Sequence, residues 1–242
     1  MLALRSHLYN VVFYLNLSVL LVFALATFAM PRKAGIIRMA QLWGRTSLWW
    51  LRTIVGTRVE YRGLDRIPPG PLLIAAKHQS FLETFALLPC VDDPAFILKQ
   101  ELQWIPVFGW LTIKAGMIPV RRGRSGALAE LKRSAARVRR GRQVIIFPEG
   151  TRRAPGAEPA YRLGVAHLYE SLEVPCIPVA LNSGLFWPRR HYLRRPGTVV
   201  IEFGDPIPPG LEREAFMALL EERIETASDR LLAEGRRALD HG

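Results

Sequence analysis

Apolar and polar positions divide the chain into two parts with different patterns. Residues 8–31 carry no charged side chain, and a run of that length exceeds the roughly 20 residues that a helix needs to cross the hydrocarbon core of a bilayer. The following stretch, residues 34–54, mixes apolar residues with spaced basic ones. We therefore expect a helix over residues 8–30, a turn at Pro31 and a second helix over residues 34–54.

The second of these helices has the composition of a segment at a membrane surface. Its basic residues, with the one just before it, are Lys33, Arg38, Arg45 and Arg52, and the apolar residues between them include Leu42, Trp43, Leu48, Trp49, Trp50 and Leu51. Indole and guanidinium groups suit the headgroup region, where tryptophan is half wet and arginine meets lipid phosphate. We expect a membrane-associated helical hairpin that either crosses the bilayer or lies in one leaflet.

Two other interpretations of the N-terminal segment stay open. A signal peptide could be cleaved at Ala24-Leu25-Ala26, although its apolar core would span only about 7–15 residues. The helices could also pack as a pair inside a soluble core. If the hairpin crosses the bilayer, the positive charge that follows it places the main domain on the cytoplasmic face of the inner or plasma membrane. We divide the chain into a membrane-associated segment, residues 1–57, and a main domain, residues 58–242.

In the main domain, short apolar runs alternate with stretches of helical character. The predicted strands are residues 72–76, 95–98, 117–120, 143–147, 176–181 and 198–203, and the predicted helices are residues 80–88, 125–139, 163–171 and 212–238. Such alternation predicts an α/β fold with a largely parallel central sheet flanked by helices. Ligands of these sheets bind outside the carboxyl ends of the strands.

Composition narrows the range of partners. The 242 residues include 33 Lys and Arg against 21 Asp and Glu, a formal net charge of +12, which favours an anionic partner such as nucleic acid, anionic lipid or an acidic protein. Only Cys90 and Cys176 could supply thiolates, which gives neither a disulfide framework nor a metal-binding cluster. We expect two buried thiols and no metal site.

The first candidate for chemistry is the pair His78 and Glu83, directly after the strand predicted at 72–76. A histidine at a strand end can act as a general base, and a carboxylate on its other ring nitrogen would fix the tautomer. Residues five apart on one helix differ by about 140° in direction, so the pair requires His78 before the helix and Glu83 in its first turn. Ser80 suits the N-cap of that helix, and Ser80-x-x-Glu83 would then be a capping box. Alternatively, Glu83 only caps the helix.

The second candidate is the segment 147–152, Phe-Pro-Glu-Gly-Thr-Arg, also directly after a predicted strand. Gly150 lets backbone approach a ligand, Thr151 can donate to a phosphate, and Arg152 can bind phosphate oxygens with two donors. Glu149 could orient Arg152 or accept a hydrogen bond from a substrate hydroxyl. The alternative is a tight turn with a surface arginine.

Two further segments follow the same pattern less clearly. Residues 116–122 form a predicted strand that opens onto Arg121 and Arg122, which suits either phosphate binding or a solvated basic turn. Residues 174–179 form an apolar strand with two prolines, which we interpret as structural, lining an acyl channel at most.

Taken together, these segments resemble the glycerolipid acyltransferase superfamily, specifically the 1-acyl-sn-glycerol-3-phosphate (lysophosphatidic acid) acyltransferases. The four matching blocks are His78 with Glu83, residues 116–122, residues 147–152 and residues 174–179. Order and spacing agree, residues 99–110 resemble the family's link between the first two blocks, and the resemblance covers residues 62–204. Two positions depart from the family pattern: Glu83 replaces the usual aspartate, and Met117 replaces valine or isoleucine.

The resemblance implies a membrane-bound enzyme that moves an acyl group from acyl-CoA or acyl-carrier protein to the free sn-2 hydroxyl of 1-acyl-glycerol-3-phosphate, giving phosphatidic acid in phospholipid biosynthesis. His78, held by Glu83, would take the hydroxyl proton. No metal or other cofactor is implied, because the acyl donor is itself a substrate. The residues implied in substrate binding are Lys99, Arg122, Glu149, Gly150, Thr151 and Arg152.

Charge and chemistry leave several alternatives. Basic residues concentrate within residues 121–142, which suits an anionic membrane surface, or else docking of an acidic acyl-carrier protein. The acceptor could be another lysolipid such as a lyso-ornithine lipid, which has no phosphate. A hydrolase would use His78 as the base for water. A nucleic-acid-binding protein would use the net charge, but the chain has no zinc-finger spacing and no RNA-binding signature.

Overall fold

The computed structural model describes residues 1–29, 33–120 and 141–240. The predicted turn at Pro31, the predicted helix over residues 125–139 and the candidate phosphate ligand Arg122 lie outside these ranges.

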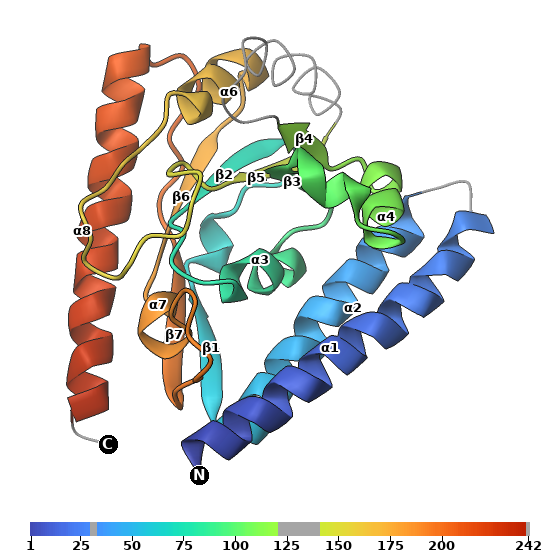
Figure 1. Cartoon of the computed structure of the whole chain (residues 1–242). Coiled ribbons are helices and arrows are strands. Elements are labelled where there is room, and N and C mark those ends of the chain that lie inside the picture. The colour runs from blue at the N-terminus through green and yellow to red at the C-terminus, as the bar shows by residue number, and fades with distance from the viewer. Residues whose placement is uncertain (30–32, 121–140, 241–242) are drawn as a thin grey trace.

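The described residues form one seven-stranded sheet, most of it parallel (Figure 1). In spatial order the strands are β1 (Thr57–Arg62), β7 (Gly197–Phe203), β6 (Cys176–Leu181), β2 (Leu72–Ala76), β5 (Gln143–Ile146), β3 (Pro94–Lys99) and β4 (Ile118–Val120). Of the described pairs, β6 with β7 is antiparallel and the others are parallel. The α/β class with a largely parallel sheet is confirmed.

All six predicted strands are present, with ends that differ by at most a residue or two. The sequence prediction missed β1, Thr-Arg-Val-Glu-Tyr-Arg, because this strand lies at the edge of the sheet and pairs only with β7. An edge strand keeps polar residues that face solvent, so it lacks the continuous apolar run by which the buried strands were recognised.

Helices cover both faces of the sheet. They are α1 (Leu2–Ala26), α2 (Ala34–Trp50), α3 (Leu82–Ala86), α4 (Phe108–Lys114), α6 (Gly164–Leu172), α7 (Ser183–Phe186) and α8 (Arg213–Asp240). Figure 1 shows α8 on one side of the sheet and the α1–α2 hairpin with α3 on the other. The predicted helix 80–88 is shorter than expected and continues as a separate 3-10 turn, Leu88–Cys90, while α4 and α7 were not predicted.

The alternation of side chains along β2 builds two cores at once. Leu72, Ile74 and Ala76 belong to the core between the sheet and the hairpin, whereas Leu73 and Ala75 belong to the core under α6 and α8. All five are fully buried. A strand covered on both faces needs apolar residues at every position, which is why β2 appears in the sequence as an uninterrupted apolar run.

The predicted hairpin is present, and it is packed onto the main domain. Leu2–Ala29 is long and apolar enough to cross a membrane, with 17% of its most apolar window buried. Its inner side nevertheless contributes Tyr9 and Phe13 to the core that includes the strands. The second helix ends at Trp50, before the predicted residue 54, and one π-helical turn, Leu51–Val55, leads into β1. The hairpin therefore exposes many apolar side chains on one side and contributes to the core on the other.

The three central strands end at the same edge, where the segments that follow them meet. β2 leads into residues 77–81, β5 into residues 147–152 and β6 into residues 182–184. Because β2 lies between β5 and β6, the segment after β2 lies between the other two. This is the edge at which parallel α/β sheets bind their ligands.

Candidate active site

The histidine and the glutamate that follow β2 meet as the sequence predicted. His78 lies in the turn before α3 and Glu83 in the first turn of that helix. The His78 Nδ1 atom is 3.0 Å from Glu83 Oε1. With Nδ1–H donating to the carboxylate, Nε2 keeps its lone pair and can accept a proton from a substrate.

Glu83 is fully buried and its two oxygens have different partners. Oε1 accepts from the backbone N–H groups of Gln79 at 2.7 Å and Ser80 at 2.6 Å, in addition to the imidazole. Oε2 accepts from the Ser183 hydroxyl at 2.8 Å. The Ser80 hydroxyl in turn accepts from the Leu82 N–H at 3.1 Å. Glu83 thus caps the turn and holds the imidazole at once, so the two sequence interpretations describe one arrangement.

The segment after β5 lies directly against the histidine. The ring of Phe147 stacks on the imidazole of His78, with centroids 4.0 Å apart and planes 17° apart. The Arg153 N–H donates to the His78 carbonyl at 2.8 Å. The two motifs found in the sequence are therefore joined by a ring contact and by a backbone hydrogen bond, and His78 is neither sealed in the core nor remote from residues 149–152.

Glu149 points inward rather than toward Arg152. It is almost fully buried, and its Oε1 lies 3.3 Å from the ammonium of Lys77 and 3.8 Å from Arg153 Nε. Burial raises the pKa of the Glu149 carboxyl, and the charge of Lys77 opposes that rise. The buried Lys77 ammonium also binds both carboxylate oxygens of Glu225 on α8, at 2.7 and 2.9 Å. Glu149 is thus positioned to hold its loop in place.

Residues 150–152 of this loop are less buried than Glu149. Gly150 has a φ of 66°, a left-handed conformation that glycine adopts without strain. Thr151 and the Arg152 side chain are half-buried, and the Arg152 carbonyl accepts from Arg189 at 2.9 Å. The Gly150 N–H donates to the Phe147 carbonyl at 2.9 Å, so Thr151 and Arg152 carry the remaining donors of this segment.

Lys99 lies farther along the same edge, at the carboxyl end of β3. Its side chain is 52% exposed and its Nζ lies 3.3 Å from Glu101. Since β5 separates β3 from β2, Lys99 is two strands away from the one that carries His78. Its role in binding an acceptor stays a prediction, as do those of Arg122, Glu149, Gly150, Thr151 and Arg152.

Sequence reasoning missed two residues that shape the site. Ser183 supplies the second partner of Glu83, and Lys77 ties Glu149 to α8. Each is a polar residue within two positions of the end of a buried strand. A polar residue just after a buried strand is a signal that the sequence does contain. It does not reveal that the partners of Ser183 and Lys77 come from elements far away in the sequence.

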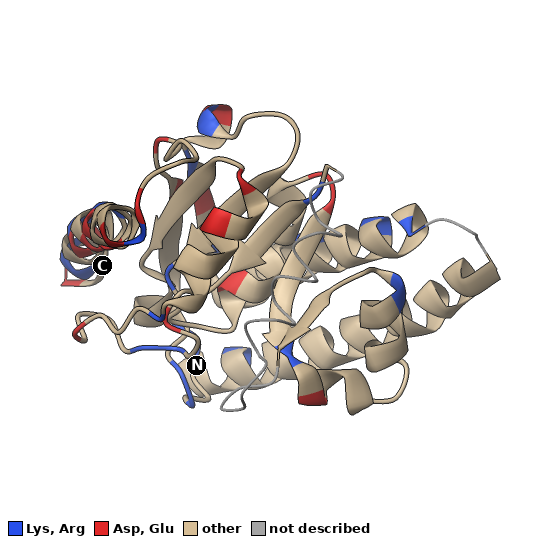
Figure 2. Cartoon of the chain, turned by 90° about the horizontal axis from the view of Figure 1, so that it is seen from above, with Lys and Arg blue, Asp and Glu red and all other residues tan. Residues whose placement is uncertain are grey.

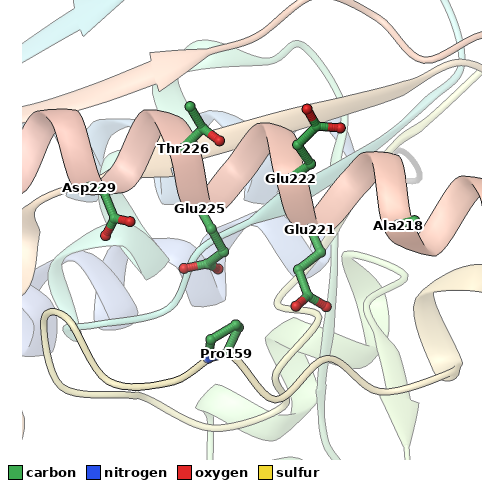
Figure 3. A pocket seen from close by; sticks show the side chains of 7 residues that line it. All are labelled: Pro159, Ala218, Glu221, Glu222, Glu225, Thr226 and Asp229. Carbon is green, nitrogen blue, oxygen red and sulfur yellow. The ribbon is translucent and has the colours of Figure 1, made fainter.

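An acidic groove runs along α8, and Glu225, a partner of Lys77, is one of its lining residues. The carboxylates that line it are those of Glu221, Glu222, Glu225 and Asp229. Figure 3 shows Glu221, Glu225 and Asp229 on the side of α8 that faces Pro159, while Glu222 points away from it. A groove of this charge repels a phosphate, so it does not suit the headgroup of an anionic lipid.

Comparison with known proteins identifies the family. The acyltransferase family model matches residues 58–182. A 1-acyl-sn-glycerol-3-phosphate acyltransferase of Pseudomonas aeruginosa is 34% identical over 209 residues, which cover 85% of this chain and 80% of that protein. The mouse 1-acyl-sn-glycerol-3-phosphate acyltransferase alpha is 32% identical over 143 residues, covering 57% of this chain and 50% of the mouse protein.

A solved structure has the same fold from end to end. The crystal structure of the 1-acyl-sn-glycerophosphate (LPA) acyltransferase PlsC from Thermotoga maritima superposes with a TM-score of 0.80 at 24% identity. The superposition covers 96% of this chain and 98% of that one, so the likeness includes the N-terminal hairpin. By the family model and by its identity to the Pseudomonas enzyme, the chain is an enzyme that belongs to the acyltransferase family, among the 1-acyl-sn-glycerol-3-phosphate acyltransferases.

Proposed function

We propose that the protein transfers a fatty acyl group from the thioester of acyl-CoA or acyl-carrier protein to the free sn-2 hydroxyl of 1-acyl-glycerol-3-phosphate, giving phosphatidic acid. The observation that carries this proposal is the His78–Glu83 pair, 3.0 Å apart, in contact with the loop that carries Thr151 and Arg152. The names of the relatives support the acceptor.

In the proposed reaction, His78 Nε2 takes the proton of the acceptor hydroxyl as its oxygen attacks the thioester carbonyl. The new C–O bond forms, the C–S bond breaks, and the imidazolium returns the proton to the leaving thiolate. Glu83, buried and held by two backbone N–H groups, stabilises the imidazolium while it exists. The thioester is already activated, so the chemistry requires no metal and no further cofactor.

We propose that the acceptor phosphate binds to donors of the loop after β5. Thr151 offers backbone and hydroxyl donors, Gly150 lets the backbone approach the phosphate, and Arg152 offers a guanidinium that can bind two phosphate oxygens. Lys99 and Arg122 are further candidates, and the charge of the whole chain, +12, favours an anionic acceptor. The basic residues that follow the apolar helix favour the cytoplasmic face of the membrane as the site of the reaction.

A matrix of acceptors and donors tests this function. The detergent-extracted protein is given lysophosphatidic acid or a lyso-ornithine lipid, each with labelled acyl-CoA and labelled acyl-carrier protein, and products are read by mass spectrometry. We expect phosphatidic acid. Acylation of the lyso-ornithine lipid alone would replace the proposed acceptor, and free fatty acid without a diacyl product would make the protein a hydrolase.

The role of the histidine is tested by His78→Ala, with the exposed His191→Ala as the matched control. Loss of general-base catalysis should lower kcat about 10²- to 10⁴-fold, with an unchanged melting temperature. Glu83→Gln should also lower kcat, because the carboxylate that stabilises the imidazolium is lost. Near wild-type turnover by His78→Ala would refute the mechanism.

The role of Arg152 is tested by Arg152→Ala beside Arg58→Ala, an exposed arginine on the edge strand β1. We expect a raised KM for the phosphate-bearing acceptor in Arg152→Ala alone, and no change in the KM for the acyl donor. Equal kinetics of the two variants would remove Arg152 from the acceptor site.

A further inference from the structure

The segment between β3 and β4 presents a second exposed apolar surface, separate from the long helix α1. It consists of the 3-10 helix Gln100–Trp104 followed by α4. We define the α4 surface as its four most exposed apolar side chains: Trp104, 72% exposed, Ile105, 46%, Trp110, 57%, and Ile113, 58%. Trp110 and Ile113 are three residues apart on a helix, so they share one face.

The opposite face of α4 fastens it to the hairpin. Leu111 and Ala115 are buried in a small cluster with Ala24 of α1 and Ile36 of α2. Figure 1 shows α4 beside the hairpin at the end away from the N-terminus. The apolar residues that α4 exposes therefore lie on the face that does not pack against the hairpin. Packing within the described chain does not explain why this face is apolar.

The α4 surface adjoins the apolar end of the candidate membrane helix, because Lys114 of α4 binds residues there. Lys114 donates to the Thr27 carbonyl at 2.7 Å, and its ammonium lies 4.8 Å from the ring centroid of Phe28. Phe28 is 43% exposed and Phe23 is 63% exposed. Figure 2 shows α1 without charged residues along nearly all of its length up to this junction.

The α4 surface is also held rigidly. A side chain at Gly109 would overlap the backbone carbonyl of Gln103, so the 3-10 helix and α4 are packed backbone to backbone. At the end of α4, the buried guanidinium of Arg142 donates to the carbonyls of Ala115 at 2.9 Å and Gly116 at 2.6 Å. Rigid exposed indoles next to a lysine are typical of a surface that contacts lipid headgroups and the first part of the acyl chains.

We propose that the α4 surface lies in the same bilayer leaflet as the hairpin and forms a second membrane contact of the enzyme. A bilayer fits this surface because it covers α1 and α4 together, and because tryptophan partitions to the boundary between headgroups and acyl chains. The contact places Lys99, which directly precedes the segment, at the level of the lipid phosphates.

Labelled single cysteines test this contact on the full-length protein in phosphatidylglycerol–phosphatidylethanolamine vesicles. An environment-sensitive dye is attached to Ile105→Cys and Ile113→Cys, with the exposed Ala233→Cys on α8, across the sheet, as the control. We expect a blue shift and quenching by nitroxide lipids at 105 and 113 only, and quenching by aqueous iodide at 233 only. Iodide quenching at all three positions would overturn the proposal. Protection of the dyes at 105 and 113 from iodide in the absence of lipid would also overturn it, because it would indicate contact with a second copy of the chain.

A kinetic test separates the membrane contact from the chemistry. Trp104→Ala/Trp110→Ala is compared with Leu64→Ala, whose leucine is 44% exposed outside this surface. With an acceptor embedded in vesicles, we expect about tenfold lower kcat/KM for the double variant. With a short-chain acceptor below its micelle concentration, we expect no change. An equal loss of kcat/KM with both acceptors, or no loss with either, would overturn the proposal. Neither result would change the role proposed for His78.

A second inference concerns Ser183. It rests on the function proposed for the His78–Glu83 pair. The Ser183 hydroxyl donates to Glu83 Oε2 at 2.8 Å, and this first residue of α7 is fully buried. Its neighbour Gly184 donates its N–H to Gln79 Oε1 at 3.1 Å, which ties the two loops together a second time.

We infer that Ser183 is a positioning residue, which fixes the rotation of the Glu83 carboxylate so that Oε1 faces the imidazole. Glutamate has one more rotatable bond than aspartate, so without a partner on Oε2 its carboxylate can turn away from His78. The two backbone N–H groups that donate to Oε1 fix the position of that oxygen, but they do not fix the rotation of the carboxylate plane.

A double-mutant cycle tests this inference. Ser183→Ala should lower kcat about tenfold with unchanged KM, and should shift the acid limb of the pH profile, which reports the imidazole. Ser183→Ala in the Glu83→Gln background should have no further effect, because the residue acts through Glu83. Losses that multiply would make Ser183 a merely structural residue. An inactive wild type would instead overturn the proposed function, whereas an active wild type whose kinetics Ser183→Ala leaves unchanged would overturn only this inference.

Discussion

Phe13 of α1 joins the membrane-associated segment to the catalytic domain, and replacing it with alanine tests that connection. Phe13 is 3% exposed. Its ring centroid lies near four aromatic rings, which come from α2, from α3 and the residue before it, and from the residue after α7. They are Trp43 at 5.7 Å, Phe81 at 6.0 Å, Phe85 at 5.5 Å and Trp187 at 6.0 Å. The side chain therefore belongs to the core, although its helix is apolar enough to span a bilayer.

The cost of the Phe13→Ala change follows from this packing. Truncating a buried phenylalanine typically costs about 3–5 kcal/mol, because transfer free energy is lost and a cavity remains. For a chain of this size, 1 kcal/mol lowers the melting temperature by about 2–4 °C. We therefore expect a decrease of about 6–20 °C. Leu15→Ala, on the same helix at a position 62% exposed, should change stability by about 0.5 kcal/mol or less.

Thermal unfolding of both variants in one detergent, followed by fluorescence and by residual acyl transfer, measures the difference. A tether that merely attaches the domain to a membrane would make the two variants alike. Melting temperatures of Phe13→Ala and Leu15→Ala that agree within about 2 °C would therefore refute the packing of the hairpin into the core.

Three further predictions follow from buried groups. Burial raises the pKa of the Cys90 thiol to about 12 and also raises that of Cys176, so maleimide at about pH 8 should label neither cysteine in the folded protein and both after denaturation. Arg142→Met should lower the free energy of unfolding in urea by about 3 kcal/mol, since the backbone carbonyls that it binds lose their donor; a loss below about 1 kcal/mol would contradict this role. Lys77→Met should raise the already elevated pKa of Glu149 further, so the variant should lose more stability in urea at about pH 8 than at about pH 5, with wild type much less dependent on pH. The sign follows because a carboxyl with a raised folded pKa is destabilising once the pH rises through that pKa.

The buried strands were predictable because burial on both faces leaves an unambiguous sequence pattern. Residues 72–76 and 176–181 were predicted with the bounds that β2 and β6 have. Edge strand β1 and the short helices α4 and α7 were not predicted. These elements are specified by their contacts: α4 by close packing on the 3-10 helix before it, and β1 by pairing with β7. Such contacts join residues that a single-sequence pattern does not connect.

The candidate site divides in the same way. The sequence predicted that His78 precedes a helix and that Glu83 lies in its first turn. Two residues five positions apart on one helix point in different directions, so the pair could not meet if both were on the helix. The sequence did not reveal the distant partners of these residues. Ser183 is 100 positions from Glu83, and Glu225 is 148 positions from Lys77. Glu149 illustrates the consequence: its motif suggested a role toward Arg152, whereas it lies against Lys77.

The aromatic cluster around Phe13 also explains how an enzyme of this family could act on a substrate dissolved in lipid. Phe81, one of its members, lies between Ser80, which binds Glu83 through its N–H, and the first residue of α3. The hairpin therefore packs against the segment that orients the imidazole of His78. With α4 fixed to the far end of the same hairpin, the proposed membrane contact sets the distance from the bilayer to the imidazole through packed side chains and not through a flexible linker. Under that proposal a lysolipid need not leave the leaflet entirely, because the proposed base is held at a constant depth relative to its headgroup. Phe13→Ala should therefore lower the activity toward an acceptor embedded in vesicles, even at temperatures at which the domain stays folded.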